Sequence, residues 1–257
     1  QGWLGLTIPE IYGGAELGFM DLVILLEEMG RHMLPGPFFS TAVLSSLAIM
    51  ECGDDKQKED YLPRIAAGQI ILAMALIEPS AIWDPSGIQL TAVTDGDTYT
   101  LNGTKLFVSD GNVADYLLVA ARTGSEATDI SLFIIPTQYE GLNQTLLKTM
   151  ASDNQSEFTF ENVRIPKVNL LGKKSGSWPS IQKIIQWGAI GKCAEMTGGG
   201  QRVLEMTVEY AKQRTQFGRP IGSFQAVQHH CANMATDVET AKFITYKAAW
   251  TLTQGLN

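Results

Sequence analysis

The spacing of hydrophobic residues changes twice along the chain and divides it into three parts. Residues 1–70 and 176–257 place apolar residues three to four positions apart, which is the spacing of one α-helix face. Residues 71–170 instead alternate between polar and apolar positions and contain frequent turn signals, which is typical of β-strands. The pattern predicts an α+β protein with a partial helical domain, a middle β domain and a partial helical bundle domain, in that order.

The first part contains one clear amphipathic stretch, FMDLVILLEEMGRHM. Five apolar residues fall near one helix face: Leu22, Leu25, Leu26, Met29 and Met33. We expect Gly30 to interrupt this helix, because glycine is a poor helix former. Pro63 and Gly68 are expected to close the first part, since both residues commonly end helices.

Two dipeptides of the middle part are strong signals for two-residue hairpin turns, Asn102-Gly103 and Asp95-Gly96. Three further stretches, DYLLVAAR, ISLFIIP and SEFTFENVRI, have the composition of strands. Many short strands with closely spaced turns predict an antiparallel barrel or sandwich.

The last part contains two long helical stretches. The first, SIQKIIQWGAIGKCAEM, is apolar on nearly every face, so it is predicted to be buried on all sides. Ser223 is the predicted N-cap of the second. Two helices cannot bury each other all round. We therefore expect either chain following Asn257 or another subunit to cover them.

Composition narrows the classes of function. The net charge is -8 and no block of Lys or Arg is present, which argues against a nucleic-acid partner. No apolar run is long enough to predict a membrane span. The three cysteines are far apart and match neither a zinc site nor a disulfide framework. A reducing compartment is expected: the cytoplasm, or the mitochondrial matrix in a eukaryote.

Three stretches together resemble the acyl-CoA dehydrogenase family: GWLGLTIPEIYGG, the region from ALIEPSAIWDP to VAART, and YAKQRTQFGRPIGSFQAVQ. The resemblance covers essentially the whole chain. It implies helical, β-barrel and helical-bundle domains, bound FAD, and a homo- or hetero-tetramer. It also implies oxidation of an acyl-CoA substrate to 2-enoyl-CoA, as in fatty-acid β-oxidation, with hydride transfer to FAD and an electron-transfer flavoprotein as electron acceptor.

The third stretch has unusual chemistry for a turn between two helices. In the family this turn reaches the FAD of the neighbouring subunit, which implies four cofactor-binding residues here: Arg214, Gln216, Phe217 and Gln225. Arginine offers a planar donor fork for phosphate oxygens, and phenylalanine can pack on an aromatic ring. The alternative is an ordinary helix–helix turn with a solvated arginine.

The resemblance also places residues of the β domain around the flavin ring. The backbone of Leu76 and Ile77 is expected along the polar edge of the ring, and Ile77 stands where much of the family has threonine. The segment Phe107, Val108 and Ser109 is expected beside the ring, with Ser109 near its reactive nitrogen. The alternatives are a barrel-core aromatic for Phe107 and a strand-end hydroxyl for Ser109.

The stretch EPSAIWDP departs from the family pattern, which has Gly-Ser-Asp after Glu-Pro-x-Ala. Ile82 and Trp83 replace the small pair, so Trp83 is expected to face the substrate in a reshaped cavity. The alternative is a surface loop that has drifted in sequence.

The catalytic base is a second departure. In most family members a glutamate in the last helices takes the α-proton, and that residue is expected beyond Asn257. In a minority the base lies at positions matching Gly188 and Ala189, neither of which takes a proton; Gly188 is expected to line the substrate site. Glu195 is expected to pair with Lys192. The chain is therefore expected to be either a fragment or a truncated, non-catalytic subunit that depends on a complete partner.

Overall fold

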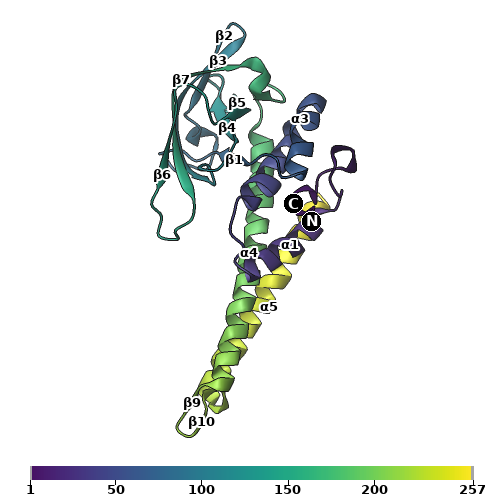
Figure 1. The fold of residues 1–257 in the computed structure, drawn as a ribbon, viewed down its shortest axis with the longest axis vertical. Helices are drawn as coiled ribbons and strands as arrows, with labels where there is room; N and C mark the ends of the chain where they lie inside the picture. Colours follow the sequence, from purple (N-terminus) through teal and green to yellow (C-terminus); the bar gives the residue numbers. More distant parts are fainter. Residues whose placement is uncertain (1, 256–257) are drawn as a thin grey trace. The chain divides into compact units, whose positions relative to one another are not determined.

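A computed structural model describes residues 2–255. It contains N-terminal helices, a central β-sheet and two long C-terminal helices (Figure 1), which confirms the predicted α+β fold class. The chain divides into two compact units. The first contains Gln1–Glu16 and Gly36–Gln186, and the second contains Leu17–Pro35 and Trp187–Asn257.

One eight-stranded sheet forms most of the first unit, with the strand order β6-β7-β3-β2-β4-β5-β8 and β1 paired to β4. The strands are β1 (Leu72–Ala75), β2 (Thr91–Asp95), β3 (Thr98–Ser109), β4 (Tyr116–Arg122), β5 (Ile130–Pro136), β6 (Leu142–Leu147), β7 (Gln155–Pro166) and β8 (Leu170–Leu171). The three strands predicted from composition are confirmed as β4, β5 and β7. The pairing is antiparallel except at β1–β4 and β2–β4, which are parallel.

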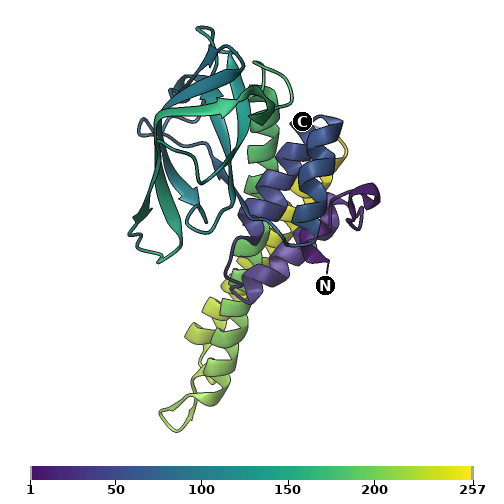
Figure 2. The same ribbon diagram turned by 45° about the horizontal axis from the view of Figure 1, so that its top comes forward.

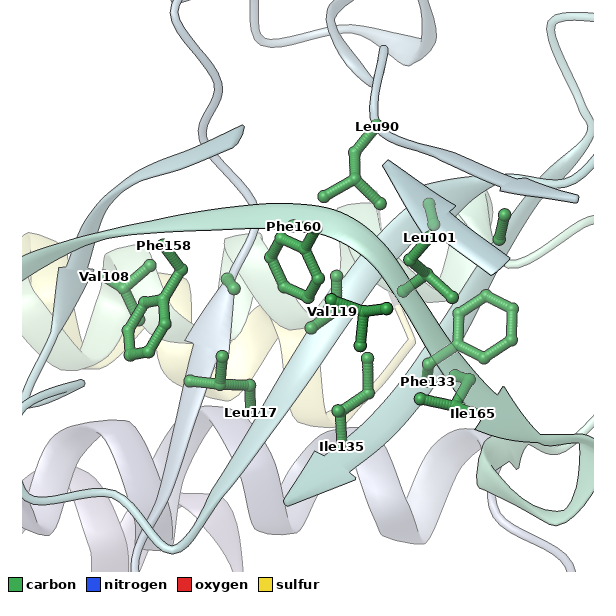
Figure 3. Packing of buried hydrophobic residues seen from close by; sticks show 14 of the residues in the cluster. Leu90, Leu101, Val108, Leu117, Val119, Phe133, Ile135, Phe158, Phe160 and Ile165 are labelled. Atoms are coloured by element: carbon green, nitrogen blue, oxygen red, sulfur yellow. The ribbon is translucent and has the colours of Figure 1, made fainter. Parts of the chain in front are cut away.

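The sheet curves around its own apolar core (Figure 3). Phe158 and Phe160 of β7 point towards β4, and the ring of Tyr99 on β3 meets that of Phe133 on β5 edge to face at 5.1 Å. Each large apolar side chain buried in this way contributes about 1.5–3 kcal/mol. The core therefore fixes the positions of β3 and β4.

The two predicted hairpin turns have different outcomes. At Asp95-Gly96 the prediction is confirmed, because Asp95 pairs with Thr98 across a two-residue loop. At Asn102-Gly103 it is wrong: β3 continues through this dipeptide, and the register with β7 shifts there. Gly103 has φ of +143°, and a Cβ on it would lie 2.8 Å from the Cα of Leu90. Glycine is needed here for a β-bulge and a close backbone approach.

Short helical elements precede and connect the strands of the first unit: η1 (Trp3–Gly5), η2 (Glu10–Tyr12), the π-helix η3 (Phe39–Ser45), α2 (Ser46–Cys52), α3 (Asp55–Ala66), η4 (Pro85–Gly87) and η5 (Lys167–Asn169). Asp54 and Gln57 form a capping box that starts α3. Pro63 lies inside α3, so the prediction that it ends the helix is wrong. It removes one hydrogen bond close to the end of the helix, and its carbonyl accepts from the Ala67 N–H at 3.0 Å.

The second unit is built from α1 (Phe19–Arg31), most of α4 (Trp178–Gln213) and α5 (Gln225–Thr253). Helices α4 and α5 run side by side in opposite directions (Figure 2). The hairpin of β9 (Thr215–Gln216) and β10 (Arg219–Pro220) joins them, followed by η6 (Ile221–Ser223). Helix α1 packs on this pair, and Arg31 donates two hydrogen bonds to the Glu205 carboxylate at 2.9 and 3.1 Å.

Gly30 does not interrupt α1, which continues to Arg31. A Cβ on Gly30 would lie 2.0 Å from the carbonyl oxygen of Glu195 on α4. Glycine is therefore needed for the close approach of two helices. Most of the predicted apolar face is buried or partly buried, but Met33 lies beyond the helix and is exposed.

One prediction about the long helices is wrong, and another is not tested within residues 2–255. Ser223 does not cap α5: the cap position is Phe224, and the Ser223 hydroxyl donates to the Pro220 carbonyl at 2.7 Å. The predicted burial of α4 on all sides assumed cover from a further segment or another subunit, and it stays a prediction: within residues 2–255 Ala194 and Thr197 are buried while Met196 is 75% exposed. In this part of the chain only one side of the helix is covered.

A buried carboxylate connects α1 to α5. Glu27 accepts hydrogen bonds from the Lys242 ammonium and the Tyr246 hydroxyl, each at 2.7 Å. Burial and the hydrogen bond to Glu27 raise the pKa of Tyr246 to about 12. The folded protein therefore holds this proton more tightly than the unfolded chain does.

Replacing Tyr246 with phenylalanine tests this contact. A pKa raised by folding gives stability that is complete below the usual tyrosine pKa of about 10. It is lost as pH rises through the folded value of about 12. The free energy of unfolding of the wild type is expected to exceed that of Tyr246→Phe by about 1 kcal/mol at pH 8, and this difference is expected to be smaller at pH 11. Urea unfolding at both pH values measures it, and a difference independent of pH would contradict the assignment.

Candidate functional site

Beyond β1 the chain runs along the end of β3 as an extended segment. The Ile77 carbonyl accepts from the Leu106 N–H at 2.8 Å, and the Leu76 carbonyl accepts from the Lys105 ammonium at 3.2 Å. Within residues 2–255 the N–H of Ile77 has no hydrogen-bond partner. This segment therefore offers a backbone donor at a half-buried position.

A β-bulge turns Phe107 outward at the end of β3. The register with β7 shifts between Lys105 and Val108, and Phe107 has φ of +51°. A non-glycine residue in this region costs about 1–3 kcal/mol, and such strain gathers at functional sites. The Phe107 side chain is 50% exposed, which excludes the barrel-core alternative, and Ser109 is exposed as well. The Val108 side chain lies in the sheet core, so only its backbone is available to a ligand.

The structure also contains a buried ion pair next to these residues, which the sequence analysis did not predict. The Lys105 ammonium lies 2.6 Å from the Glu78 carboxylate, and their side chains are 0% and 3% exposed. Burial lowers the pKa of Lys105 to about 8, against the opposing effect of Glu78. The sequence did contain a signal for it. Lys105 is an even number of positions from Tyr99 and Leu101, which are buried, so alternation along the strand places the lysine on the same, buried face of β3.

The loop that carries Trp83 is closed at its base and held along its length. The Glu78 carboxylate accepts from the N–H groups of Gln89 at 2.8 Å and Leu90 at 3.1 Å. The Arg122 guanidinium donates to the carbonyl of Ile88 at 2.9 Å and to that of Pro85. The Trp83 side chain is nevertheless 61% exposed. A hydrogen-bonded frame thus holds a large apolar side chain in solvent.

The β9–β10 hairpin holds the second group of predicted residues. Phe217 and Gly218 have φ of +53° and +76°, as a tight two-residue hairpin turn requires. The Phe217 and Phe224 rings meet edge to face at 6.2 Å, and the Arg219 guanidinium lies 4.2 Å from the Phe224 ring centre. The hairpin also presents the exposed side chains of Arg214, Gln216 and Gln225.

The predicted residues thus form two groups, one in each compact unit. The first unit brings together Leu76, Ile77, Phe107, Val108 and Ser109 and carries the Trp83 loop. The second unit holds the four residues of the hairpin region and Gly188, which is buried in α4.

Two further side chains of α4 bear on the site prediction. The indole nitrogen of Trp187, beside Gly188, is buried without a hydrogen-bond partner in the described residues, and the ring lies 4.5 Å from that of Phe19. Sequence reasoning did not select it. Glu195 accepts from the Lys192 ammonium at 2.6 Å, which confirms the predicted pair.

Residues 2–255 contain neither a metal site nor a membrane span. No group of three His, Cys, Asp or Glu side chains there is arranged to hold a metal ion. No helix in that range has the length and apolar character needed to cross a membrane.

Comparison with known families gives three matches in chain order. They are the acyl-CoA dehydrogenase N-terminal domain over residues 1–69, the middle domain over 73–163 and the C-terminal domain over 176–257. The chain is 35% identical to the 3-(aryl)acrylate reductase of Clostridium sporogenes and 33% identical to an acyl-CoA dehydrogenase of Bacillus subtilis. The alignments cover 99% and 100% of this chain and 70% of each relative.

Solved structures agree with this match. Butyryl-CoA dehydrogenase from Megasphaera elsdenii superposes with a TM-score of 0.92 at 31% identity, covering 100% of this chain and 70% of that one. The FAD complex of PigA superposes with the same score at 29% identity, covering 100% of this chain and 69% of that one. The chain therefore belongs to the acyl-CoA dehydrogenase family.

Proposed function

We propose that this chain forms part of an FAD-dependent oxidoreductase that converts an acyl-CoA thioester to its 2-enoyl-CoA. The observation that carries the proposal is the free Ile77 N–H at the end of β3, next to the bulge that exposes Phe107 and Ser109. A backbone donor, an aromatic ring and a hydroxyl fit the polar edge and the face of a flavin ring. The relatives named as dehydrogenases and reductases support the same class of reaction.

The hairpin residues fit the rest of the cofactor. The exposed Arg214 guanidinium would hold phosphate oxygens through its donor fork, while the amides of Gln216 and Gln225 add donors and acceptors. Phe217, which is 93% exposed, would cover an aromatic ring. FAD, when bound, supplies the acceptor for the two electrons removed from the substrate. We place these residues at the FAD of a neighbouring subunit in a homo- or hetero-tetramer.

Trp83 in the first unit and Gly188 in the second are each proposed to be substrate-binding residues. The frame around Trp83 favours a site shaped by this side chain over a loop without a role. Glu195 is held by Lys192, so among residues 2–255 we assign no base that takes the α-proton. An electron-transfer flavoprotein is the proposed electron acceptor, supported by a relative named as a subunit of the caffeyl-CoA reductase-Etf complex of Acetobacterium woodii.

Anaerobic titration tests the reaction. The purified protein is loaded with FAD, and a panel of acyl-CoA thioesters is added while the flavin absorbance is recorded. Bleaching by one thioester would support the proposed reaction, show that a base is available in this protein, and name the substrate class. Retained FAD with no bleaching by any thioester would contradict a complete active site and favour a partner-dependent subunit.

Replacing Arg214 with alanine is expected to weaken FAD binding. Hydrogen bonds to a charged group contribute about 1.5–3 kcal/mol, which corresponds to a rise in Kd of about 10- to 100-fold. Isothermal titration with FAD measures the change. Arg202→Ala is the matched control, because Arg202 is an exposed arginine on α4 that pairs with Glu205. Equal Kd values for the two variants would remove Arg214 from the site.

A further inference from the structure

We propose that Lys105 and Glu78 are positioning residues of the flavin site. They lock the segment Leu76–Glu78, the bulge at Phe107 and the base of the Trp83 loop into one arrangement. The identity of the ligand rests on the proposed function; the arrangement rests on contacts within the first unit.

The two side chains connect three pieces of backbone. The Lys105 ammonium on β3 reaches back to the Leu76 carbonyl at 3.2 Å and to the Glu78 carboxylate at 2.6 Å. Glu78 in turn accepts from the backbone N–H groups of Gln89 and Leu90, where the chain returns to β2. One buried cation and one buried anion therefore join the segment after β1, the end of β3 and the start of β2.

These contacts lie next to the ligand-facing groups. Ile77, whose N–H has no hydrogen-bond partner within residues 2–255, stands between the two residues that Lys105 binds. Phe107, the residue with positive φ, follows Lys105 by two positions. Moving the ammonium would therefore change both the backbone donor and the aromatic side chain.

A purely structural role explains the pair poorly. Apolar residues of similar volume would fill this position at equal or greater stability, because burying two charges is costly. Charged hydrogen bonds instead require particular distances and directions, and a strand supports them more rigidly than a loop. The chemistry thus suits a part of the molecule in which backbone position matters.

The first unit contains a matched pair without these connections. Lys183 and Glu51 are also 2.6 Å apart, but their side chains are 48% and 35% exposed. The contact joins two side chains and no backbone of the candidate site. Lys183→Met is therefore the control for removing one lysine from an ion pair.

Two variants separate position from stability. Glu78→Gln keeps a side-chain acceptor but removes the charge. The double variant Glu78→Gln with Lys105→Met removes both charges, so no unpaired ion stays buried. Each protein is checked for folding by its thermal transition and then titrated with FAD. Limited chymotrypsin digestion, followed by mass spectrometry, measures cleavage after Trp83 without any cofactor.

The expected result is a rise in the FAD Kd of about tenfold or more in both variants, with faster cleavage after Trp83. Lys183→Met is expected to match wild type in both measurements. Folded variants that keep the wild-type Kd and cleavage rate would overturn the proposal and leave the pair a structural role only. If wild type itself binds no FAD while cleavage still responds to the variants, the proposed function fails and the flavin-positioning role is overturned with it, although the loop anchor stands.

Discussion

Replacing Lys105 with methionine is expected to lower the free energy of unfolding by about 3–5 kcal/mol. The reason is the Glu78 carboxylate, which loses its countercharge. Glu78 is 5% exposed, and its nearest cation is the Lys105 ammonium at 2.6 Å. Methionine fills a similar volume but leaves this carboxylate buried without a countercharge. Urea denaturation at pH 7, followed by circular dichroism, measures the loss.

Two comparisons make this result specific. Lys183→Met removes a lysine from a half-exposed pair and is expected to cost less than about 1 kcal/mol. Adding Glu78→Gln to Lys105→Met is expected to restore part of the stability, because the second change removes the unpaired charge. A loss in the free energy of unfolding below about 1 kcal/mol for Lys105→Met alone would contradict a buried ion pair, because that is the value of an exposed pair.

Replacing Gly198 with alanine is expected to destabilise the second unit by about 3 kcal/mol, at the upper end of the usual cost of overpacking. A Cβ on Gly198 would lie 1.8 Å from the carbonyl oxygen of Glu27 and 2.8 Å from the nitrogen of Arg31, both backbone atoms of α1. Backbone cannot rotate away as a side chain can, so α1 would have to move from α4. Chemical denaturation measures the loss.

Gly200 is the matched control two residues further along α4. A Cβ there would meet its nearest neighbour, Cγ2 of Val238, at 3.5 Å, which is an ordinary contact. Alanine has a better helix propensity than glycine by about 1 kcal/mol, so Gly200→Ala is expected to stabilise the protein by up to that amount. Equal effects of the two substitutions would show that helix propensity, and not the contact with α1, governs these glycines.

Local backbone geometry, which the hydrophobic pattern does not report, decides which of the predicted site residues are exposed. The resemblance placed Phe107, Val108 and Ser109 together beside the flavin. The structure exposes Phe107 and Ser109 and buries Val108 in the sheet core. Simple alternation from Tyr99, Leu101 and Lys105 along β3 would bury residue 107 and expose residue 108, and the bulge against β7 reverses both. Their contact with FAD stays a prediction.

The sequence by itself determined the order of helical, β and helical parts, the strands β4, β5 and β7, and the turn at Asp95-Gly96. These features depend on neighbouring residues, because side-chain periodicity and turn propensity are local properties. The family resemblance was also contained in the sequence.

Only the tertiary structure decided the features that depend on residues far apart in the chain. Asn102-Gly103 has the composition of a turn, yet the approach of Leu90 makes it a bulge within β3. Gly30 looks like a helix breaker until α1 and α4 come into contact. Glu78 and Lys105 are 27 positions apart, and folding alone removes both from water and leaves each as the other's counterion. Local sequence preferences therefore determine where helices and strands form. Packing between distant segments determines the roles of residues such as these glycines and the buried ion pair.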